Sequence, residues 1–186
     1  MQIWVVTGVL VLFGIYVVVS FNRLVTLRYR MRDAWSQIDV QLKRRYDLIP
    51  NLVNAVTGYL DHERSTLEAV TRARQQAMAA GAGSDVNARA AAESALSFAT
   101  SKLMGLVEVY PALRASENML GLQEELASTE NRIAFARQFY NDTVMEYNTA
   151  RGTFPRNLLA GPFGFAFAQM FALDDPGQRA APQVHV

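Results

Sequence analysis

The feature that most constrains this chain is an uncharged apolar run of nineteen residues near its start, Ile3 to Phe21. At a rise of about 1.5 Å per residue, a helix of that length is about 28 Å long, close to the hydrocarbon thickness of a bilayer. Trp4 and Tyr16 lie near its two edges, where the aromatic residues of membrane helices gather. The run therefore predicts a transmembrane anchor over residues 1–22.

Two other interpretations of this run are weaker. A cleavable signal peptide has a basic start, a shorter apolar stretch and a cleavage site of small residues, and Val18 to Asn22 is a poor cleavage site. A buried core helix is the second alternative, but a helix of this length that is apolar on every face has little reason to stand at a chain terminus. We therefore expect an uncleaved anchor.

Basic residues crowd the chain directly after the run. They are Arg23, Arg28, Arg30 and Arg32. Residues 1–46 carry a net charge of +5, although the whole chain carries only +1. Positive flanks stay on the cytoplasmic side, so we expect a single-pass protein of the bacterial inner membrane with its N-terminus outside and its domain in the cytoplasm. These arginines could also contact anionic lipid head groups, although a role in topology alone explains them.

The rest of the chain shows helical periodicity and no strand-like alternation. One apolar stripe runs from about Trp35 to Val70 and passes through Pro50 without a change of phase. It predicts one kinked helix, with a new helix opening at Pro50 as the alternative. Glycines around residue 81 end this helix. Two further stripes follow, Leu96–Tyr110 and Leu122–Tyr147.

Short connections between long amphipathic helices make neighbours antiparallel. The predicted fold class is therefore all-α, with the transmembrane helix followed by an antiparallel up-and-down four-helix bundle over residues 23–173. The fourth helix is the least regular, at about 156–173. Residues 174–186 hold two prolines and a glycine and are expected to be extended or disordered.

The apolar stretch from Leu158 to Leu173 carries no charge, and Gly161, Pro162 and Gly164 interrupt it. It holds the four phenylalanines Phe163, Phe165, Phe167 and Phe171. A short helix packed on the bundle is one interpretation. The alternative is a lipid-facing or self-association segment, because an exposed patch of four phenylalanines would not stay in water.

Motifs for chemistry are missing from the sequence. The chain has no cysteine, and the pair His62-Glu63 lacks the second histidine of a zinc helix, since Thr66 stands in its place. We therefore expect no catalytic residue, no metal, no cofactor and, from the near-neutral charge, no nucleic acid partner. Four polar residues close to the apolar stripes are expected to set helix register: Asp39, Glu63, Asn131 and Asn141.

Several stretches resemble the LemA family of bacterial membrane proteins. The resemblance covers nearly the whole chain. It lies in residues 22–28, 34–53, 110–113, 129–133, 137–141, 147–148, 154–155, 160–161 and 163–165. It implies a four-helix bundle on a membrane anchor, a role as scaffold or accessory component, and no established enzymatic activity. The sequence departs from the family after Phe165, where Ala166 and Phe167 stand in place of a common lysine.

The residues and the resemblance together predict a non-enzymatic, membrane-anchored scaffold or adaptor that associates with itself and with membrane lipids. A second membrane protein is a further possible partner. The alternative is a membrane-shaping or lipid-binding protein that uses the arginine-rich flank and the phenylalanine-rich segment.

Overall fold

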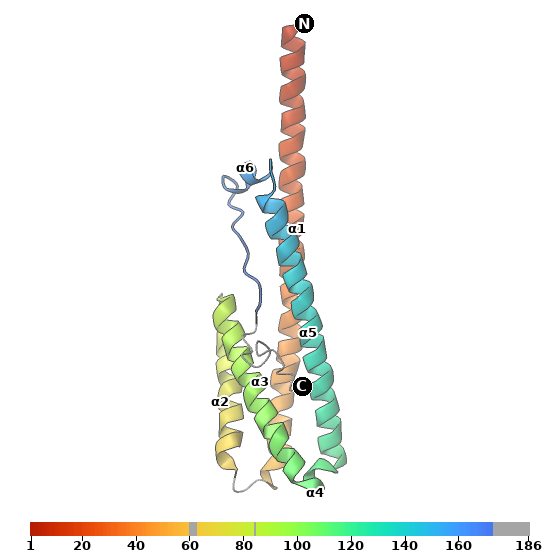
Figure 1. The fold of residues 1–186 in the computed structure, drawn as a ribbon, viewed down its shortest axis with the longest axis vertical. Helices are drawn as coiled ribbons and strands as arrows, with labels where there is room; N and C mark the ends of the chain where they lie inside the picture. The colour runs from red at the N-terminus through yellow and green to blue at the C-terminus, as the bar shows by residue number, and fades with distance from the viewer. Residues whose placement is uncertain (60–62, 84, 173–186) are drawn as a thin grey trace, which may run out of the picture. The chain divides into compact units, whose positions relative to one another are not determined.

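The computed structural model describes residues 1–59, 63–83 and 85–172, and most of them are helical (Figure 1). The long helices are α1 (Gln2–Thr57), α2 (Arg64–Gly81), α3 (Val86–Val109) and α5 (Glu117–Gly152). Two single-turn helices are α4 (Pro111–Arg114) and α6 (Asn157–Ala160). No strand occurs in the described residues, and the predicted all-α class is confirmed. The tail predicted at 174–186 and both histidines lie outside the described residues.

Backbone contacts divide the chain into two units, each described by itself. The first contains Met1–Asp39 and Phe135–Met170. The second contains Val40–Ala134 and resumes at Phe171. The sequence predicted one domain over residues 23–173. Helices α1 and α5 run through both units, whereas α2 and α3 belong wholly to the second.

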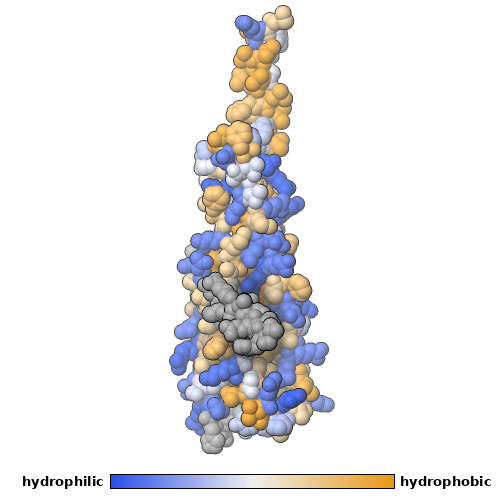
Figure 2. Space-filling view, in the orientation of Figure 1, coloured by the Kyte–Doolittle hydropathy of each residue, from blue (hydrophilic) through white to orange (hydrophobic). Residues whose placement is uncertain are grey.

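Helix α1 changes its surroundings along its length. Its first part is exposed on all sides, with Trp4 82% and Phe13 61% exposed, and Figure 2 shows apolar side chains covering this end. From Leu24 onward one face is buried at spacings of three, four and seven residues. The buried side chains on this face include Leu24, Leu27, Ala34, Ile38, Leu42, Ile49, Leu52 and Val56. Among the described helices, α1 is the one long and apolar enough to cross a membrane by length and composition.

The stripe predicted as one helix from Trp35 to Val70 is divided between α1 and α2. Helix α1 continues through Pro50, as predicted, but it ends at Thr57 and α2 begins at Arg64. Gly58 follows the end of α1, and glycine costs about 1 kcal/mol relative to alanine inside a helix. The prediction of a continuous helix was wrong. Each helix buries one part of the stripe, and the helical spacing of the apolar residues continues across the break, so the spacing gives no sign of it.

In the second unit, α2, α3 and the adjoining parts of α1 and α5 form a four-helix bundle (Figure 1). Asp85 caps the start of α3, since its Oδ1 accepts hydrogen bonds from the backbone N–H groups of Asn87 at 2.9 Å and Ala88 at 3.2 Å. The core consists of buried aliphatic side chains. They include Leu42, Ile49 and Val56 from α1, Val70 from α2, Leu96 and Leu103 from α3, and Leu126 and Ile133 from α5.

The first unit has a small core between α1, α5 and the chain that follows α5. Its buried members are Leu24, Leu27, Tyr147, Ala160 and Phe165. The helix predicted at 156–173 is wrong, because α6 lasts one turn and no helix follows it up to residue 172. Gly164 has a φ of 70°, and the backbone N–H of Phe165 bonds the Ala160 carbonyl at 2.9 Å. This left-handed glycine closes the turn and ends helical geometry.

Candidate functional site

The non-helical residues 165–169 are held against α5 by side chains that bond their main chain. The Tyr147 hydroxyl donates to the Ala166 carbonyl at 2.8 Å, and the Tyr140 hydroxyl donates to the Gln169 carbonyl at 2.9 Å. Arg151 Nε donates to the Phe165 carbonyl at 2.6 Å. The Asn148 amide donates to the Ala168 carbonyl at 2.9 Å and accepts from its N–H at 3.0 Å. Side chains of α5 thus replace the hydrogen bonds that a helix would have made.

These α5 residues share one helical face, because positions seven and eleven residues after Tyr140 lie within about 20° of its direction and the position eight residues on lies within about 80°. Tyr140 is 5% and Tyr147 is 2% exposed. Burial raises the pKa of both phenols above the usual value for tyrosine. Both tyrosines therefore stay neutral donors well beyond neutral pH.

Aromatic rings join this segment to α1. The Phe21 ring lies edge-to-face with the rings of Phe163, at 5.2 Å between centroids, and Phe165, at 5.7 Å. Phe21 is the last residue of the uncharged run, so the contact lies at the end of the predicted span. Edge-to-face pairs at these separations are favourable for ring quadrupoles.

The four phenylalanines of the predicted patch separate into two kinds. Phe165 and Phe171 are buried, at 4% and 1% exposed, whereas Phe163 and Phe167 are 48% and 64% exposed. The Arg151 guanidinium lies over the Phe167 ring, 3.7 Å from its centroid. A lipid or protein surface can therefore reach Phe163 and Phe167, while Phe165 and Phe171 pack inside the chain.

The residues predicted to set topology lie along α1 between Trp4 and Arg32. Trp4 is exposed and Tyr16 is half-buried. Arg23 pairs with Glu146 of α5 at 2.5 Å, with both side chains just under half exposed. Arg28, Arg30 and Arg32 are exposed, and Arg32 lies 5.8 Å from the centroid of the Tyr29 ring. The arginine at the end of the run is thus partly neutralised, whereas the other three face outward.

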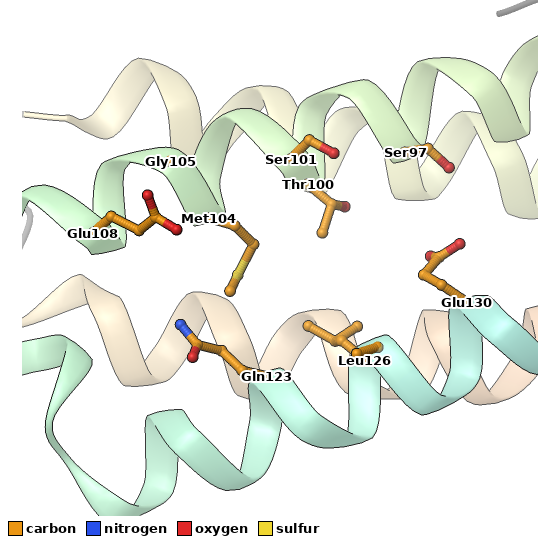
Figure 3. Close-up of a pocket in the computed structure, with 10 residues that line it drawn as sticks. Ser97, Thr100, Ser101, Met104, Gly105, Glu108, Gln123, Leu126 and Glu130 are labelled. Atoms are coloured by element: carbon orange, nitrogen blue, oxygen red, sulfur yellow. The ribbon is translucent and has the colours of Figure 1, made fainter. Parts of the chain in front are cut away.

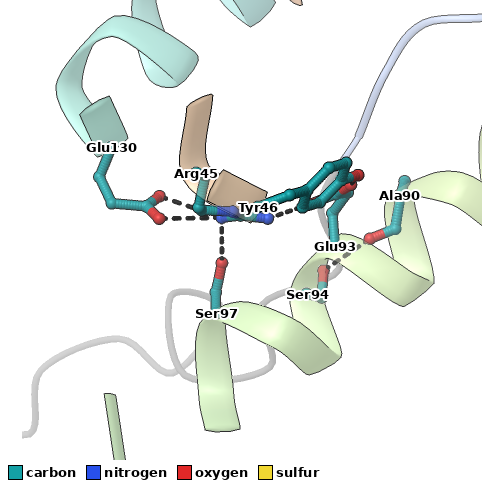
Figure 4. Close-up of polar contacts among 7 residues, drawn as sticks. All are labelled: Arg45, Tyr46, Ala90, Glu93, Ser94, Ser97 and Glu130. Atoms are coloured by element: carbon teal, nitrogen blue, oxygen red, sulfur yellow. Dashed lines mark hydrogen bonds and ion pairs between the residues drawn. The ribbon is translucent and has the colours of Figure 1, made fainter. Parts of the chain in front are cut away.

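A buried polar cluster lies inside the second unit (Figure 4). Arg45 of α1 is 2% exposed and pairs with Glu93 of α3, which is also 2% exposed. Its Nη1 also donates to Ser97 of α3 at 2.9 Å and to Glu130 of α5 at 2.9 Å. One guanidinium therefore joins three helices of the bundle.

Tyr46 of α1 belongs to the same cluster. Its hydroxyl donates to Glu93, and its carbonyl accepts a 2.6 Å hydrogen bond from Arg74 Nε of α2. Burial raises the pKa of Tyr46 strongly, and the Glu93 carboxylate raises it further by accepting the hydrogen bond and by its charge. This cluster stabilises one arrangement of helices, because buried charges are tolerated only where their partners are in place.

The sequence prediction of register-setting polar residues named other positions. Asn131 is exposed, Glu63 stands directly before α2, and Asp39 and Asn141 are half-buried. Arg45 and Glu93 were missed. A signal was available for Arg45, because it lies seven residues from both Ile38 and Leu52, which are buried on the same face.

A groove of about 490 Å³ between α3 and α5 adjoins the cluster (Figure 3). Ser97 and Glu130, which both bind Arg45, stand at one end, and Thr100, Glu108 and Gln123 also line it. No group of three or more metal-ligating side chains occurs in the described residues. The groove thus offers polar contacts from both α3 and α5.

The fold and these sites define a class: all-helical chains in which an apolar N-terminal helix extends into a helical bundle, with features that support membrane association. The chain belongs to the LemA family, whose family model matches residues 34–186. The family resemblance in the sequence is confirmed.

Magnetosome proteins are among the similar relatives. MamQ of Magnetospirillum gryphiswaldense is 24% identical over an alignment 185 residues long, gaps included, and the alignment covers 87% of this chain and 68% of the relative. MamQ 1 and MamQ 2 of Paramagnetospirillum magneticum are each 25% identical over an alignment 174 residues long, gaps included, and each alignment covers 81% of this chain and 64% of the relative. The chain thus spans about two thirds of the length of these relatives. None of these names is that of an enzyme.

Proposed function

We propose that this protein is a membrane-anchored, non-enzymatic scaffold that presents its helical bundle at the cytoplasmic face of the bacterial inner membrane. The observation that carries the proposal is the change of surroundings along α1. The helix is exposed on all faces around Trp4 to Phe13 and buried on one face from Leu24 onward. A helix that is apolar all round suits lipid, whereas a one-sided stripe suits a protein core.

The cytoplasmic orientation rests on charge. Arg28, Arg30 and Arg32 are exposed on the bundle side of the run, where positive residues resist translocation. A scaffold role also agrees with the burial of the main charged pair. Arg45 and Glu93 are each 2% exposed, so they serve the bundle and offer no contact to a substrate.

Self-association forms part of the proposal. Phe135 and Phe139 lie four residues apart on α5 and are 73% and 48% exposed. Residues at this spacing share a helix face, and an exposed aromatic pair is a typical site for protein contact. A second copy of this chain or another membrane protein would cover it.

Topology is tested with single cysteines, because the natural chain has none. Cysteine is placed in the full-length protein at Gln2, beside the start of the run, or at the exposed Thr149 of α5. In intact spheroplasts a membrane-impermeant maleimide should label Q2C and should label T149C only after the membrane is opened. The reverse pattern would overturn the orientation, and extraction of the protein by alkaline carbonate would overturn the anchor.

Self-association is tested by native mass measurement of the full-length protein in mild detergent. We expect an oligomer, and we expect F135S/F139S to reduce it towards the monomer. F98S is the matched control, because Phe98 is 75% exposed on α3. A wild-type protein that is strictly monomeric would contradict this part of the proposal.

A membrane-shaping role is the second candidate, favoured by the exposed rings of Phe163 and Phe167 and by the exposed arginines after the span. Full-length protein reconstituted into vesicles with anionic lipid should then narrow or tubulate them in electron micrographs. F163S/F167S should restore round vesicles. Unchanged vesicles with the wild-type protein would remove this candidate.

A further inference from the structure

We propose that the segment of residues 154–167 docks on the lipid interface beside the span, so that the protein contacts the membrane twice on the bundle side. The inference rests on the proposed function in one respect: Ile3 to Phe21 must cross the bilayer. It adds a specific lipid-binding surface to the anchor.

The depth of the segment follows from its contacts with α1. Phe21 ends the uncharged run and therefore lies at the boundary of the hydrocarbon region. The Phe163 ring is 5.2 Å from the Phe21 ring, and Ala160 packs in the same core as Leu24 and Leu27. Residues 160–163 thus lie within about one helical turn of the level where the span meets the interface.

Apolar side chains of this segment point away from the protein. Four are substantially exposed: Phe154 at 74%, Leu158 at 64%, Phe163 at 48% and Phe167 at 64%. Such a concentration of exposed large side chains on one short segment is typical of a surface that a partner covers. Because the segment lies beside the end of the span, lipid is the partner that covers this surface.

Main-chain carbonyl groups of the segment already have hydrogen-bond partners, which suits a poorly hydrated environment. Irregular backbone is tolerated near hydrocarbon only where protein groups satisfy its polar atoms. The carbonyls of Phe165 and Ala166 accept hydrogen bonds from the Arg151 and Tyr147 side chains of α5. The segment can therefore approach the bilayer without leaving these carbonyls unpaired.

The charge of the segment fits an anionic interface. Between Glu146 and Asp174 the sequence contains no acidic residue, whereas it contains Arg151 and Arg156. Arg151 lies over the exposed Phe167 ring, so one site offers a cation and an aromatic face together. Basic and aromatic side chains in this combination bind the head-group region of membranes with anionic lipids.

Lipid contact is tested with single-tryptophan reporters in the full-length protein. The natural tryptophans, Trp4 and Trp35, are replaced by phenylalanine, and F163W or F167W supplies the reporter. The protein is placed in nanodiscs of phosphatidylethanolamine and phosphatidylglycerol that carry a spin-labelled lipid with the label near the head group. We expect both reporters to lose most of their emission, and to lose less in nanodiscs of phosphatidylcholine alone.

Two controls separate this inference from the proposed anchor. F98W reports an exposed position in the second unit and should keep its emission. A variant that retains only Trp4 should be quenched, which tests the span. Full emission from F163W and F167W while Trp4 is quenched would overturn the lipid contact and favour a second copy as the cover. Full emission from Trp4 as well would overturn the anchor itself.

Discussion

The two units of this protein are stabilised by different kinds of polar contact. In the second unit, a charged arginine and a carboxylate are buried together, and the guanidinium joins α1, α3 and α5. In the first unit, mostly neutral side chains of α5 bond the backbone of a non-helical segment. The two units should therefore lose different amounts of stability when one partner of a contact is removed. A buried charge left unpaired is strongly destabilising, whereas water can replace part of a neutral contact.

The largest expected effect comes from breaking the ion pair. Glu93→Ala leaves Arg45 buried without its main carboxylate, and removal of one partner of such a pair costs about 3–5 kcal/mol. The measurement is urea unfolding of the full-length protein in detergent, followed by circular dichroism. E108A is the matched control, since Glu108 is exposed on the same helix.

The double variant R45M/E93L sharpens this result. Apolar replacement of both partners removes the unpaired charge, so most of the lost stability should return. If the double variant were as unstable as E93A, lost packing would explain the effect better than charge.

A smaller effect is expected in the first unit. Asn148→Ala removes two hydrogen bonds to Ala168 and should cost about 2 kcal/mol. The loss should be local, with faster amide exchange in residues 165–170 and little change in α3. T149A, an exposed neighbour on α5, is the control. Faster exchange in α3 as well would show that the two units unfold together.

Alkaline pH should weaken both units through their tyrosines. The folded pKa of Tyr46, Tyr140 and Tyr147 is raised above the ordinary value of 10.0, so the folded state holds these protons more tightly than the unfolded state. The stabilisation is complete below pH 10 and is lost as pH rises above it, by about 1.4 kcal/mol per pH unit for each fully linked tyrosine.

Urea midpoints between pH 8 and 11.5 measure this loss. The variant Y46F should be less stable at pH 8, because it lacks the bond to Glu93, and should fall less steeply with pH. Equal slopes for wild type and Y46F would contradict the contribution of Tyr46.

The smallest effect belongs to the ion pair of Arg23 and Glu146. Both side chains are just under half exposed, and pairs of this kind contribute about 0–1 kcal/mol. A double-mutant cycle of R23A and E146A should give a small coupling energy that disappears at high salt. A coupling energy as large as the destabilisation caused by E93A would show that the polar contacts of the two units do not differ in strength.

Local patterns predicted much of the fold. The α5 stripe from Leu126 to Tyr147 is buried as its periodicity indicated, and the all-α class followed from such stripes. The end of α1 at Thr57 was not predicted, because α1 and α2 share one core and the spacing of their apolar residues continues from one helix into the next. The prediction of a helix at 156–173 was wrong because glycine and proline disfavour a helix in this segment, whereas its apolar content favours one. Composition alone cannot show which of the two effects is stronger.

The sites depended on contacts between distant residues. Tyr140 and Tyr147 were predicted as apolar stripe residues, yet their hydroxyls bond carbonyls some twenty to thirty residues further along the chain. Glu93 meets Arg45 across two helices, and no local spacing connects them. Such pairings become visible only when the helices are placed side by side.

The continuity of α1 also determines which side of the apolar run any neighbouring membrane helix would meet. An α-helix turns by about 100° per residue, so the direction of each side chain between Ile3 and Phe21 is set by that of Leu24. One residue inserted at Asn22 would rotate the whole run by about 100° relative to Leu24 without changing its hydrophobicity. Seven inserted residues would restore its direction to within about 20°. The direction in which the apolar run faces is therefore fixed relative to the face of α1 that packs against α5.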